Sequence, residues 1–332
     1  YLIAAKLCIS VCNSAHSRKV NPDNEYALVS EESAWKMLHK WLVLSPLHVE
    51  NIFRKLKGLT SKAQNWLNNI YKKINFFYKI LFMLIDKQIK QFKNDGLVLV
   101  PELFNKSEVE LILKYTEELQ TSPEVSGKEW KYFEKSKINK DEKILQRIEN
   151  FCKYHKGFSE LCTESRIIEC VNDCFGEKGI LFKDKINFKM PGGVGFNPHQ
   201  DSQAGWDDYA KFYLTAMISV DNSTVQNGCL EFAYGHNKSG LIGKLWKPLS
   251  DEDMKNMKFI PIETKPGDTI FFDCYSPHRS KPNLTKKPRR ILYLTYNKLS
   301  DGDQRKKYYD DKYKNYPPDI DRDPNKDYIF KV

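Results

Sequence analysis

A series of short apolar segments beginning near Ile180 constrains the fold of this chain more than any other feature of its sequence. Each segment is rich in β-branched and aromatic residues, and each is bounded by Gly, Pro, Asn or Asp. Strands at this spacing, with turn signals between them, predict a mainly β fold: a sandwich or barrel with flanking helices. The segments are GILFKDKINFKM, KFYLTAMISVD, GCLEFAYG, FIPIETKPGDTIFFD and RRILYLTYNKL.

The chain before these segments divides near residue 84. Residues 1–83 have apolar side chains at helical spacing and no catalytic constellation, so we expect a helical N-terminal segment, consistent with the tail of an upstream domain. Residues 84–332 are expected to form a second domain. It is predicted to begin with a helix to about Lys93, an Asn-Asp-Gly turn, the strand LVLV and a helix capped near Asn105 or Ser107.

The stretch from residue 121 to residue 180 is predicted to contain polar loops and helices. Within it, EKILQRIENFCKYHKGFSELCTESRIIECVNDCFG carries Ile, Leu, Phe and Cys at three- and four-residue spacing, which favours helices that face the core. The charged and tyrosine-rich end of the chain is expected to wrap the surface of the second domain.

Composition narrows the classes of partner and compartment. The chain has a formal net charge of +10, but its lysines are spread along the sequence rather than gathered in one block, which argues against a nucleic-acid interface. Its eight cysteines show no paired CxxC spacing, so we expect reduced, mostly buried thiols and a cytoplasmic protein. The most apolar stretch, Ile74 to Asp86, is interrupted by Lys79 and falls short of a membrane span.

An H-x-D pair, His199 and Asp201, is the first candidate for a functional site. Because side chains in an extended segment repeat every two residues, both side chains point to the same side. His278 follows another strand 77 residues after Asp201 and supplies a third candidate ligand. Two histidines and one carboxylate can occupy one face of an octahedral metal and leave positions open for a co-substrate and oxygen, which is the arrangement of non-haem Fe(II) oxygenases.

Arg289 stands eleven residues after His278, at the start of the strand RRILYLTYN. Its planar guanidinium can hold a carboxylate with two parallel hydrogen bonds. An iron triad followed by such an arginine is the outline of a site for 2-oxoglutarate.

Six ordered motifs between about Asp86 and Asn297 resemble those of the phytanoyl-CoA dioxygenase family of Fe(II)/2-oxoglutarate-dependent oxygenases. The resemblance covers about two thirds of the chain. The motifs are QIKQFKNDGLVLVPELF, INFKMPGG, PHQD, NGCLEFAYGHNKSG, KPGDTIFFDCYSPHRSKPN and the downstream arginine.

The resemblance implies a double-stranded β-helix (jelly-roll) core and a dioxygenase that uses 2-oxoglutarate and O2. It also implies that His199, Asp201 and His278 bind Fe(II). In the family, the arginine eleven residues after the distal histidine holds the far carboxylate of 2-oxoglutarate.

That role falls on Arg289 rather than on its neighbour Arg290. Two further positions, Ser280 and Lys189, fall where family members contact the co-substrate. The co-substrate site implied by the resemblance therefore consists of an arginine, a serine and a lysine.

The run HQDSQAGWDDYAKFY resembles the branch that includes 2-aminoethylphosphonate dioxygenases more than the acyl-CoA branch, and the tail YNKLSDGDQRKKYYDDKYKNYPPD is similar to that branch too. We expect Gln203, Trp206 and Tyr209 to line the substrate pocket, although Trp206 is equally suited to the core. Glu231 is a further residue placed to face the site. The expected reaction hydroxylates a C–H bond of a small charged molecule, such as 2-aminoethylphosphonate, and releases succinate and CO2.

Other functions stay open at this point. One is hydroxylation of an acyl-CoA or another small metabolite, and another is a catalytically inactive jelly-roll binding module. The intact residues His199, Asp201, His278 and Arg289 count against the inactive module, because loss of one of them is its expected mark. A hydroxylase of proteins or nucleic acids would need a binding groove, which the sequence does not indicate, and the sequence is silent on oligomeric state.

Overall fold

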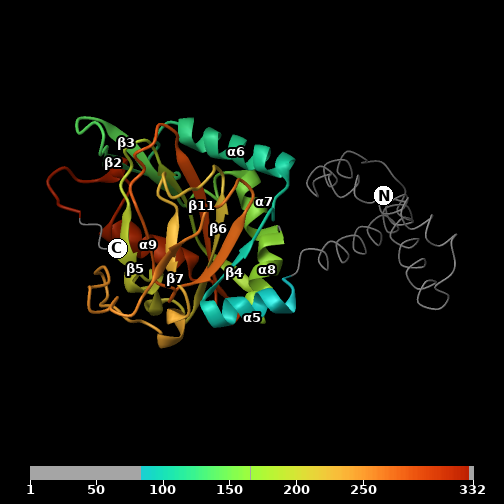
Figure 1. Ribbon diagram of the computed structural model, residues 1–332. Helices are drawn as coiled ribbons and strands as arrows, with labels where there is room; N and C mark the ends of the chain where they lie inside the picture. The colour runs from blue at the N-terminus through green and yellow to red at the C-terminus, as the bar shows by residue number, and fades with distance from the viewer. Residues whose placement is uncertain (1–83, 165, 329–332) are drawn as a thin grey trace, which may run out of the picture. The chain divides into compact units, whose positions relative to one another are not determined.

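The computed structural model describes residues 84–164 and 166–328, which fold around two antiparallel sheets (Figure 1). The helical segment predicted for residues 1–83 lies outside the described residues. The larger sheet has seven strands in the order β1-β9-β6-β11-β4-β3-β2, and the smaller has four in the order β5-β10-β7-β8. The strands are β1 (Leu97–Val100), β2 (Trp130–Lys135), β3 (Lys143–Glu149), β4 (Gly179–Lys189), β5 (Phe196–His199), β6 (Tyr213–Ser219), β7 (Leu230–Ala233), β8 (Phe259–Pro261), β9 (Thr269–Asp273), β10 (His278–Ser280) and β11 (Arg289–Lys298).

Strand order and burial together make this a jelly-roll core. Sequence neighbours such as β9 and β10 lie in different sheets, so the chain passes repeatedly from one sheet to the other. Apolar side chains of both sheets meet in one cluster, among them Met217 and Ile270 of the larger sheet and Phe232 of the smaller. The predicted sandwich with flanking helices is confirmed.

The other face of the larger sheet is covered by helices. Figure 1 shows α6, α7 and α8 gathered along one side of the strands, with α5 at one end. Buried residues of these helices, such as Phe158 and Val171, share a cluster with Ile186 and Leu292 of the sheet. The helices are α5 (Asp86–Asp95), α6 (Lys106–Thr121), α7 (Lys156–Glu164), α8 (Arg166–Phe175) and α9 (Arg305–Asn315), with short 3-10 turns η1 (Asp201–Ala204), η2 (Trp206–Asp208), η3 (His236–Ser239), η4 (Leu299–Asp301) and η5 (Asp319–Asp321).

The start of the described chain, from residue 84, follows the expectations from the sequence closely. Helix α5 ends at Gly96, whose φ of 80° is a left-handed conformation that glycine adopts without strain. Strand β1 follows at once, and α6 is capped by Asn105, whose side-chain oxygen accepts a hydrogen bond from the backbone N–H of Glu108 at 3.1 Å. The predicted helix, turn, strand and capped helix are all confirmed.

One prediction for the middle of the chain is wrong. The segment EKILQRIEN was expected to be a helix facing the core, but it contains strand β3, which pairs with β2 on one side and β4 on the other. Its apolar residues Ile144 and Ile148 fit a helical spacing of four, which a strand of period two also satisfies. Pairing with two neighbouring strands decides between the two, since tertiary contacts override local preference.

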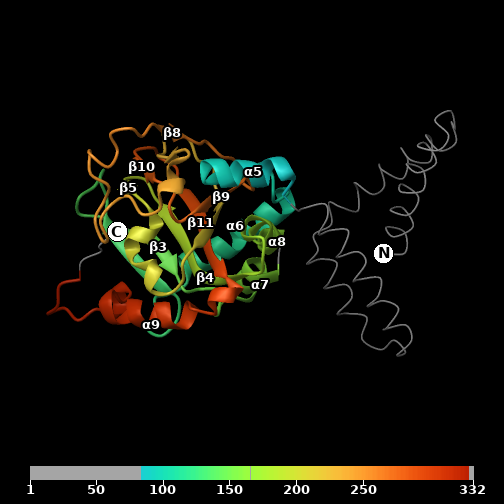
Figure 2. The ribbon, with the colours of Figure 1, turned by 90° about the horizontal axis from the view of Figure 1, so that it is seen from below.

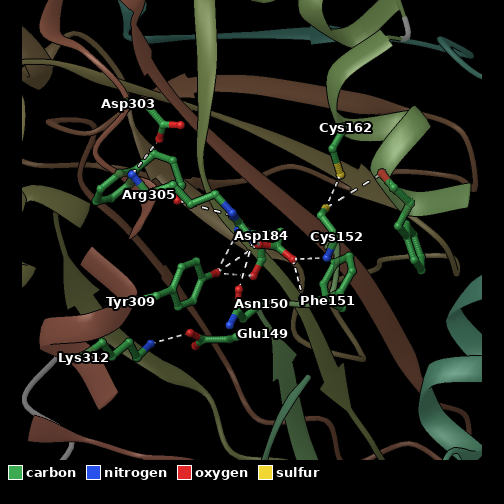
Figure 3. Close-up of polar contacts among 12 residues, drawn as sticks. Glu149, Asn150, Phe151, Cys152, Cys162, Asp184, Asp303, Arg305, Tyr309 and Lys312 are labelled. Atoms are coloured by element: carbon green, nitrogen blue, oxygen red, sulfur yellow. Dashed lines mark hydrogen bonds and ion pairs between the residues drawn. The ribbon is translucent and has the colours of Figure 1, made fainter. Parts of the chain in front are cut away.

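The tyrosine-rich tail does more than wrap the surface. Helix α9 packs against β4, and its residues Tyr308 and Tyr309 are buried. Figure 3 shows Asp184 of β4 at the centre of a polar cluster: its carboxylate pairs with Arg305 at 2.5 Å and accepts a hydrogen bond from the Tyr309 hydroxyl at 3.0 Å. In Figure 2, α9 lies below β4, on the opposite side of the described residues from α5 and β8.

The six cysteines among the described residues are all free and buried, as expected for structural thiols. Burial raises the pKa of each of these thiols. Within residues 84–164 and 166–328, no helix combines the length and the apolar character that a bilayer crossing requires.

Candidate active site

Strand pairing brings the two histidines of the predicted triad together. Strand β10 runs antiparallel to β5, and His278 stands directly opposite His199 in the register. The two imidazole rings lie with their centroids 4.3 Å apart. Asp201 follows β5 by two residues, and one ligand atom from each of the three side chains lies within 4.8 Å of the other two.

Both imidazoles present the same nitrogen to the centre of this triad. The Nδ1–H of His199 donates to the backbone carbonyl of Asn197 at 2.7 Å, and the Nδ1–H of His278 donates to the carbonyl of Ser276 at 3.0 Å. Each Nε2 is therefore free to act as a lone-pair donor, and each lies 3.9 to 4.0 Å from Oδ1 of Asp201.

Burial keeps the two rings neutral. Desolvation, reinforced by the neighbouring His278 ring, lowers the pKa of His199 to about 3. Desolvation also lowers the pKa of His278. Because a metal binds only the neutral imidazole, both rings are in their ligating form at neutral pH.

A pair of threonines from the larger sheet orients the Asp201 carboxylate of the triad. The Thr215 hydroxyl lies 3.5 Å from Oδ2 of Asp201, and Thr215 and Thr295 hydroxyls are 2.9 Å apart. Next along the chain, the backbone N–H of Ser202 donates to the carbonyl of Cys274 at 3.1 Å. Oδ2 is thus turned toward the threonines and Oδ1 toward the histidines.

Arg289 is a buried cation that pairs with no carboxylate among residues 84–164 and 166–328. Its side chain is 1% exposed, its Nε has no hydrogen-bond partner among the described residues, and its Nη1 donates a long hydrogen bond of 3.4 Å to the Ser223 hydroxyl. Burial lowers the pKa of the guanidinium. A buried guanidinium left in this state indicates a place for a ligand carboxylate. Its neighbour Arg290 is instead paired with Asp221.

Lys189 lies opposite Arg289, and Lys189 and Ser280, the two other positions expected to contact the co-substrate, are bonded to each other. Lys189 is the register partner of Arg289 on β4, and its ammonium lies 2.7 Å from the Ser280 hydroxyl. The same ammonium donates to the carbonyls of Lys281 at 2.6 Å and Gly228 at 3.3 Å. An ammonium has three donors, so contact with a co-substrate would require Lys189 to give up one of these partners.

The triad opens into a pocket between the two sheets, with an empty volume of about 750 Å³ counting its mouth. The smaller sheet contributes both histidines, and the larger sheet contributes charged side chains that the sequence analysis did not single out. Two of these, Lys183 and Lys185, alternate along β4 with the polar Asn187, which is the signal in KDKINFK that could have identified them. The lining residues are Arg147, Glu149, Lys183, Lys185, Asn187, Phe196, His199, Asp201, Ala204, Trp206, Thr215, Leu230, Phe272, His278, Tyr293 and Thr295.

Of the residues predicted to face the substrate, some line the pocket and others lie outside it. Trp206 is among the residues that line the pocket and also packs in an aromatic cluster. Tyr209 lies outside the lining and bonds Asp311 of α9 at 3.1 Å. Glu231 also lies outside it, 2.8 Å from Nε of Arg279.

Gln203 is fully buried and anchors a loop. Its amide nitrogen donates to the carbonyls of Lys244 at 2.9 Å and Lys247 at 2.6 Å, and its oxygen accepts from the backbone N–H of Gln200 at 2.8 Å. Gln200 holds the same loop by donating to the carbonyl of Gly240 at 2.8 Å. The two glutamines beside the triad therefore tie the segment that follows β7 to the edge of the pocket.

We expect Gln203→Ala to lower the free energy of unfolding by about 2–4 kcal/mol, because three hydrogen bonds are lost and the buried backbone N–H of Gln200 is left unpaired. Urea denaturation measures this loss, and Gln91→Ala, a change at an exposed glutamine of α5, is the matched control. A Gln203→Ala protein as stable as the control, with only a raised KM for its substrate, would contradict the anchoring role.

Comparison with known proteins places this geometry in a family. The phytanoyl-CoA dioxygenase (PhyH) family matches residues 92–291. A 2-aminoethylphosphonate dioxygenase of an uncultured bacterium (HF130_AEPn_1) is 38% identical over 247 residues, which is 73% of this chain and 92% of that protein. A methylphosphonate hydroxylase of Gimesia maris is 35% identical over 234 residues, which is 70% of this chain and 88% of that protein.

A solved structure shows the same fold at lower identity. EctD from S. alaskensis, crystallised with 2-oxoglutarate and 5-hydroxyectoine, superposes with a TM-score of 0.56 at 20% identity and covers 66% of this chain and 77% of its own. The profile match spans more than half of the chain, and it contains the H-x-D pair, the distal histidine and Arg289. The chain belongs to the phytanoyl-CoA dioxygenase (PhyH) family.

Proposed function

We propose that this dioxygenase hydroxylates a C–H bond of a small phosphonate, using Fe(II), O2 and 2-oxoglutarate and releasing succinate and CO2. The observation that carries the proposal is the convergence of His199, Asp201 and His278, which line one pocket and whose ligand atoms lie within 4.8 Å of one another.

The donor set fits ferrous iron. Two neutral imidazole nitrogens and one carboxylate oxygen on one side of an ion leave its remaining positions open to other ligands. When bound, iron together with 2-oxoglutarate and O2 supplies the oxidation of C–H to C–OH. The chain contributes the orientation of the ligands, through the carbonyls that hold each Nδ1–H and the threonine that holds Oδ2 of Asp201.

Arg289 is suited to bind the far carboxylate of 2-oxoglutarate. It lies opposite Lys189, which is bonded to Ser280, and Ser280 stands two residues along β10 from His278. At about 3.3 Å per strand residue, this places Ser280 about 7 Å of strand from the metal ligand. A carboxylate here would supply the partner that the buried guanidinium lacks.

The charges of the pocket support an anionic substrate. Arg147, Lys183 and Lys185 line it, and Glu149 is the one carboxylate of the lining besides Asp201. The two curated relatives described above are named for action on 2-aminoethylphosphonate and methylphosphonate, and both compounds carry a phosphonate. A pocket of this polarity suits a compact anion better than a long apolar acyl chain.

Succinate formation across a substrate panel tests the proposal. The anaerobically purified protein receives Fe(II) and 2-oxoglutarate, then oxygen, with 2-aminoethylphosphonate, methylphosphonate, a sulfonate of the same length or phytanoyl-CoA. We expect substrate-dependent succinate with at least one of the phosphonates and little with the others. Succinate formed only with the acyl-CoA would contradict the substrate class, and none with any compound would favour an inactive binding module.

A further inference from the structure

Two lysines of the pocket have no partner within the part of the chain that is described. Lys183 and Lys185 both line the pocket, and neither ammonium forms a hydrogen bond or ion pair with another residue of 84–164 or 166–328. Instead, the ammonium of Lys185 lies 4.8 Å from the centroid of the Tyr293 ring, and that of Lys183 lies 5.5 Å from the Trp206 ring. Aromatic faces hold both cations in place without neutralising them.

The nearby carboxylate is already committed. Oε1 of Glu149 pairs with Nε of Arg147 at 2.8 Å, and Oε2 pairs with the ammonium of Lys312 from α9 (Figure 3). Glu149 stands opposite Lys185 in the register, but both of its oxygens are engaged by other cations. Consistent with this, the neighbouring cations hold the pKa of Glu149 well below its usual range despite its burial.

Unneutralised charge in this place is costly to the folded protein. Burial, with the charge of Lys183 next in weight, lowers the pKa of Lys185 to about 7. The negative charge of Asp201 acts in the other direction and raises the pKa of Lys185. A metal ion bound to Asp201 would neutralise that charge and remove this effect. Groups that are kept unpaired at such a cost are typical of functional sites, where a ligand supplies the missing partner.

The register separates these lysines from the candidate co-substrate site. Lys183 stands opposite Thr295, which bonds Thr215, the residue that contacts Asp201. Arg289 lies six residues before Thr295 on the same strand, about 20 Å away at 3.3 Å per residue. An anion held by Lys183 and Lys185 would therefore lie on the opposite side from the carboxylate that Arg289 is suited to bind.

We propose that Lys183 and Lys185 together bind the phosphonate group of the substrate and thereby place the adjacent C–H bond beside the metal ligands. This rests on the proposed function and adds to it the residues that select the substrate. Two ammonium groups match the two negative charges and three oxygens of a phosphonate. They match a singly charged sulfonate or carboxylate less well.

Calorimetric titration of the full chain, loaded anaerobically with Fe(II) and 2-oxoglutarate, tests the assignment. The probes are methylphosphonate and methanesulfonate, applied to Lys183→Met, Lys185→Met, the double variant and Lys185→Arg. We expect the Kd for methylphosphonate to rise about tenfold or more in each methionine variant and about a hundredfold in the double variant, since each loses a charged hydrogen bond. Lys185→Arg keeps the charge and should stay within several-fold of the wild type.

Lys178→Met, at an exposed lysine just before β4, is the matched control and should bind methylphosphonate as the wild type does. Methionine keeps the apolar stem and removes an unpaired charge, so the melting temperature of each methionine variant should be equal to or above that of the wild type. Equal Kd values for methylphosphonate in wild type and double variant would overturn the assignment, as would methanesulfonate binding as tightly as methylphosphonate.

The outcome separates this inference from the proposed function. If methylphosphonate binding depends on the two lysines but the wild type forms no succinate, the binding site stands and the proposed hydroxylase activity is refuted. If the wild type hydroxylates a phosphonate and the double variant has the same KM for it, the proposed function stands and the lysine site is refuted.

Discussion

Asp201→Ala is expected to reduce iron-dependent succinate formation by at least about a thousandfold, which corresponds to about 4 kcal/mol in the activation barrier. The substitution removes the only carboxylate of the His-Asp-His group, and two imidazoles alone bind Fe(II) weakly. The fold should persist, because the Asp201 side chain makes one long hydrogen bond, to Thr215 at 3.5 Å. Turnover and iron content of the purified protein are the two measurements.

Asp251→Ala changes an exposed aspartate and serves as the matched control. It should retain wild-type turnover, iron content and melting temperature. An Asp201→Ala protein that keeps more than about a tenth of the wild-type rate would show that this carboxylate is not a metal ligand, since loss of a ligand costs more than one tenfold step.

Arg289→Ala is expected to raise the KM for 2-oxoglutarate about a hundredfold, the effect of losing a bidentate, charge-assisted pair worth about 3 kcal/mol. Iron affinity should change much less, because Arg289 is not among the three clustered ligand residues. The guanidinium is buried without a carboxylate partner in the described chain, so its removal should not lower the melting temperature. Steady-state kinetics with varied 2-oxoglutarate, beside a titration with Fe(II), separates the two effects.

Arg290→Lys provides the comparison at the adjacent position. Arg290 pairs with Asp221 through Nε at 2.8 Å, and lysine can keep an ion pair there. This variant should have the wild-type KM for 2-oxoglutarate. If Arg289→Ala also kept that KM, or if it lost iron and 2-oxoglutarate together, the arginine would not be the anchor of the co-substrate.

Much of the fold could be predicted from local sequence. Strands β4, β6, β7, β8, β9 and β11 lie in segments that combine β-branched and aromatic residues with clear turn signals, and the Asn-Asp-Gly turn and Asn105 cap mark the start of the described chain. Strand β3 could not be distinguished from a helix, because Ile144 and Ile148 suit both periods and its pairing with β2 and β4 is a long-range fact.

Some features of the candidate site could likewise be predicted from the sequence, and others could not. The spacing of the H-x-D pair, His278 and Arg289 indicated which residues to examine, because their chemistry depends on residue type and order. The sequence could not show that Gln203 turns toward the loop at Lys244 and Lys247, nor that the second oxygen of Glu149 is engaged by Lys312 from α9. These are contacts between segments distant in the chain, and they decide which charges of the pocket stay unpaired.

Incubation with 2-aminoethylphosphonate under ¹⁸O2 tests the central claim most directly. With Fe(II) and 2-oxoglutarate present, we predict equal amounts of succinate and of phosphonate hydroxylated on the carbon next to phosphorus, each carrying one ¹⁸O atom. Succinate without hydroxylated phosphonate, or no succinate at all from protein shown to contain iron, would contradict the account.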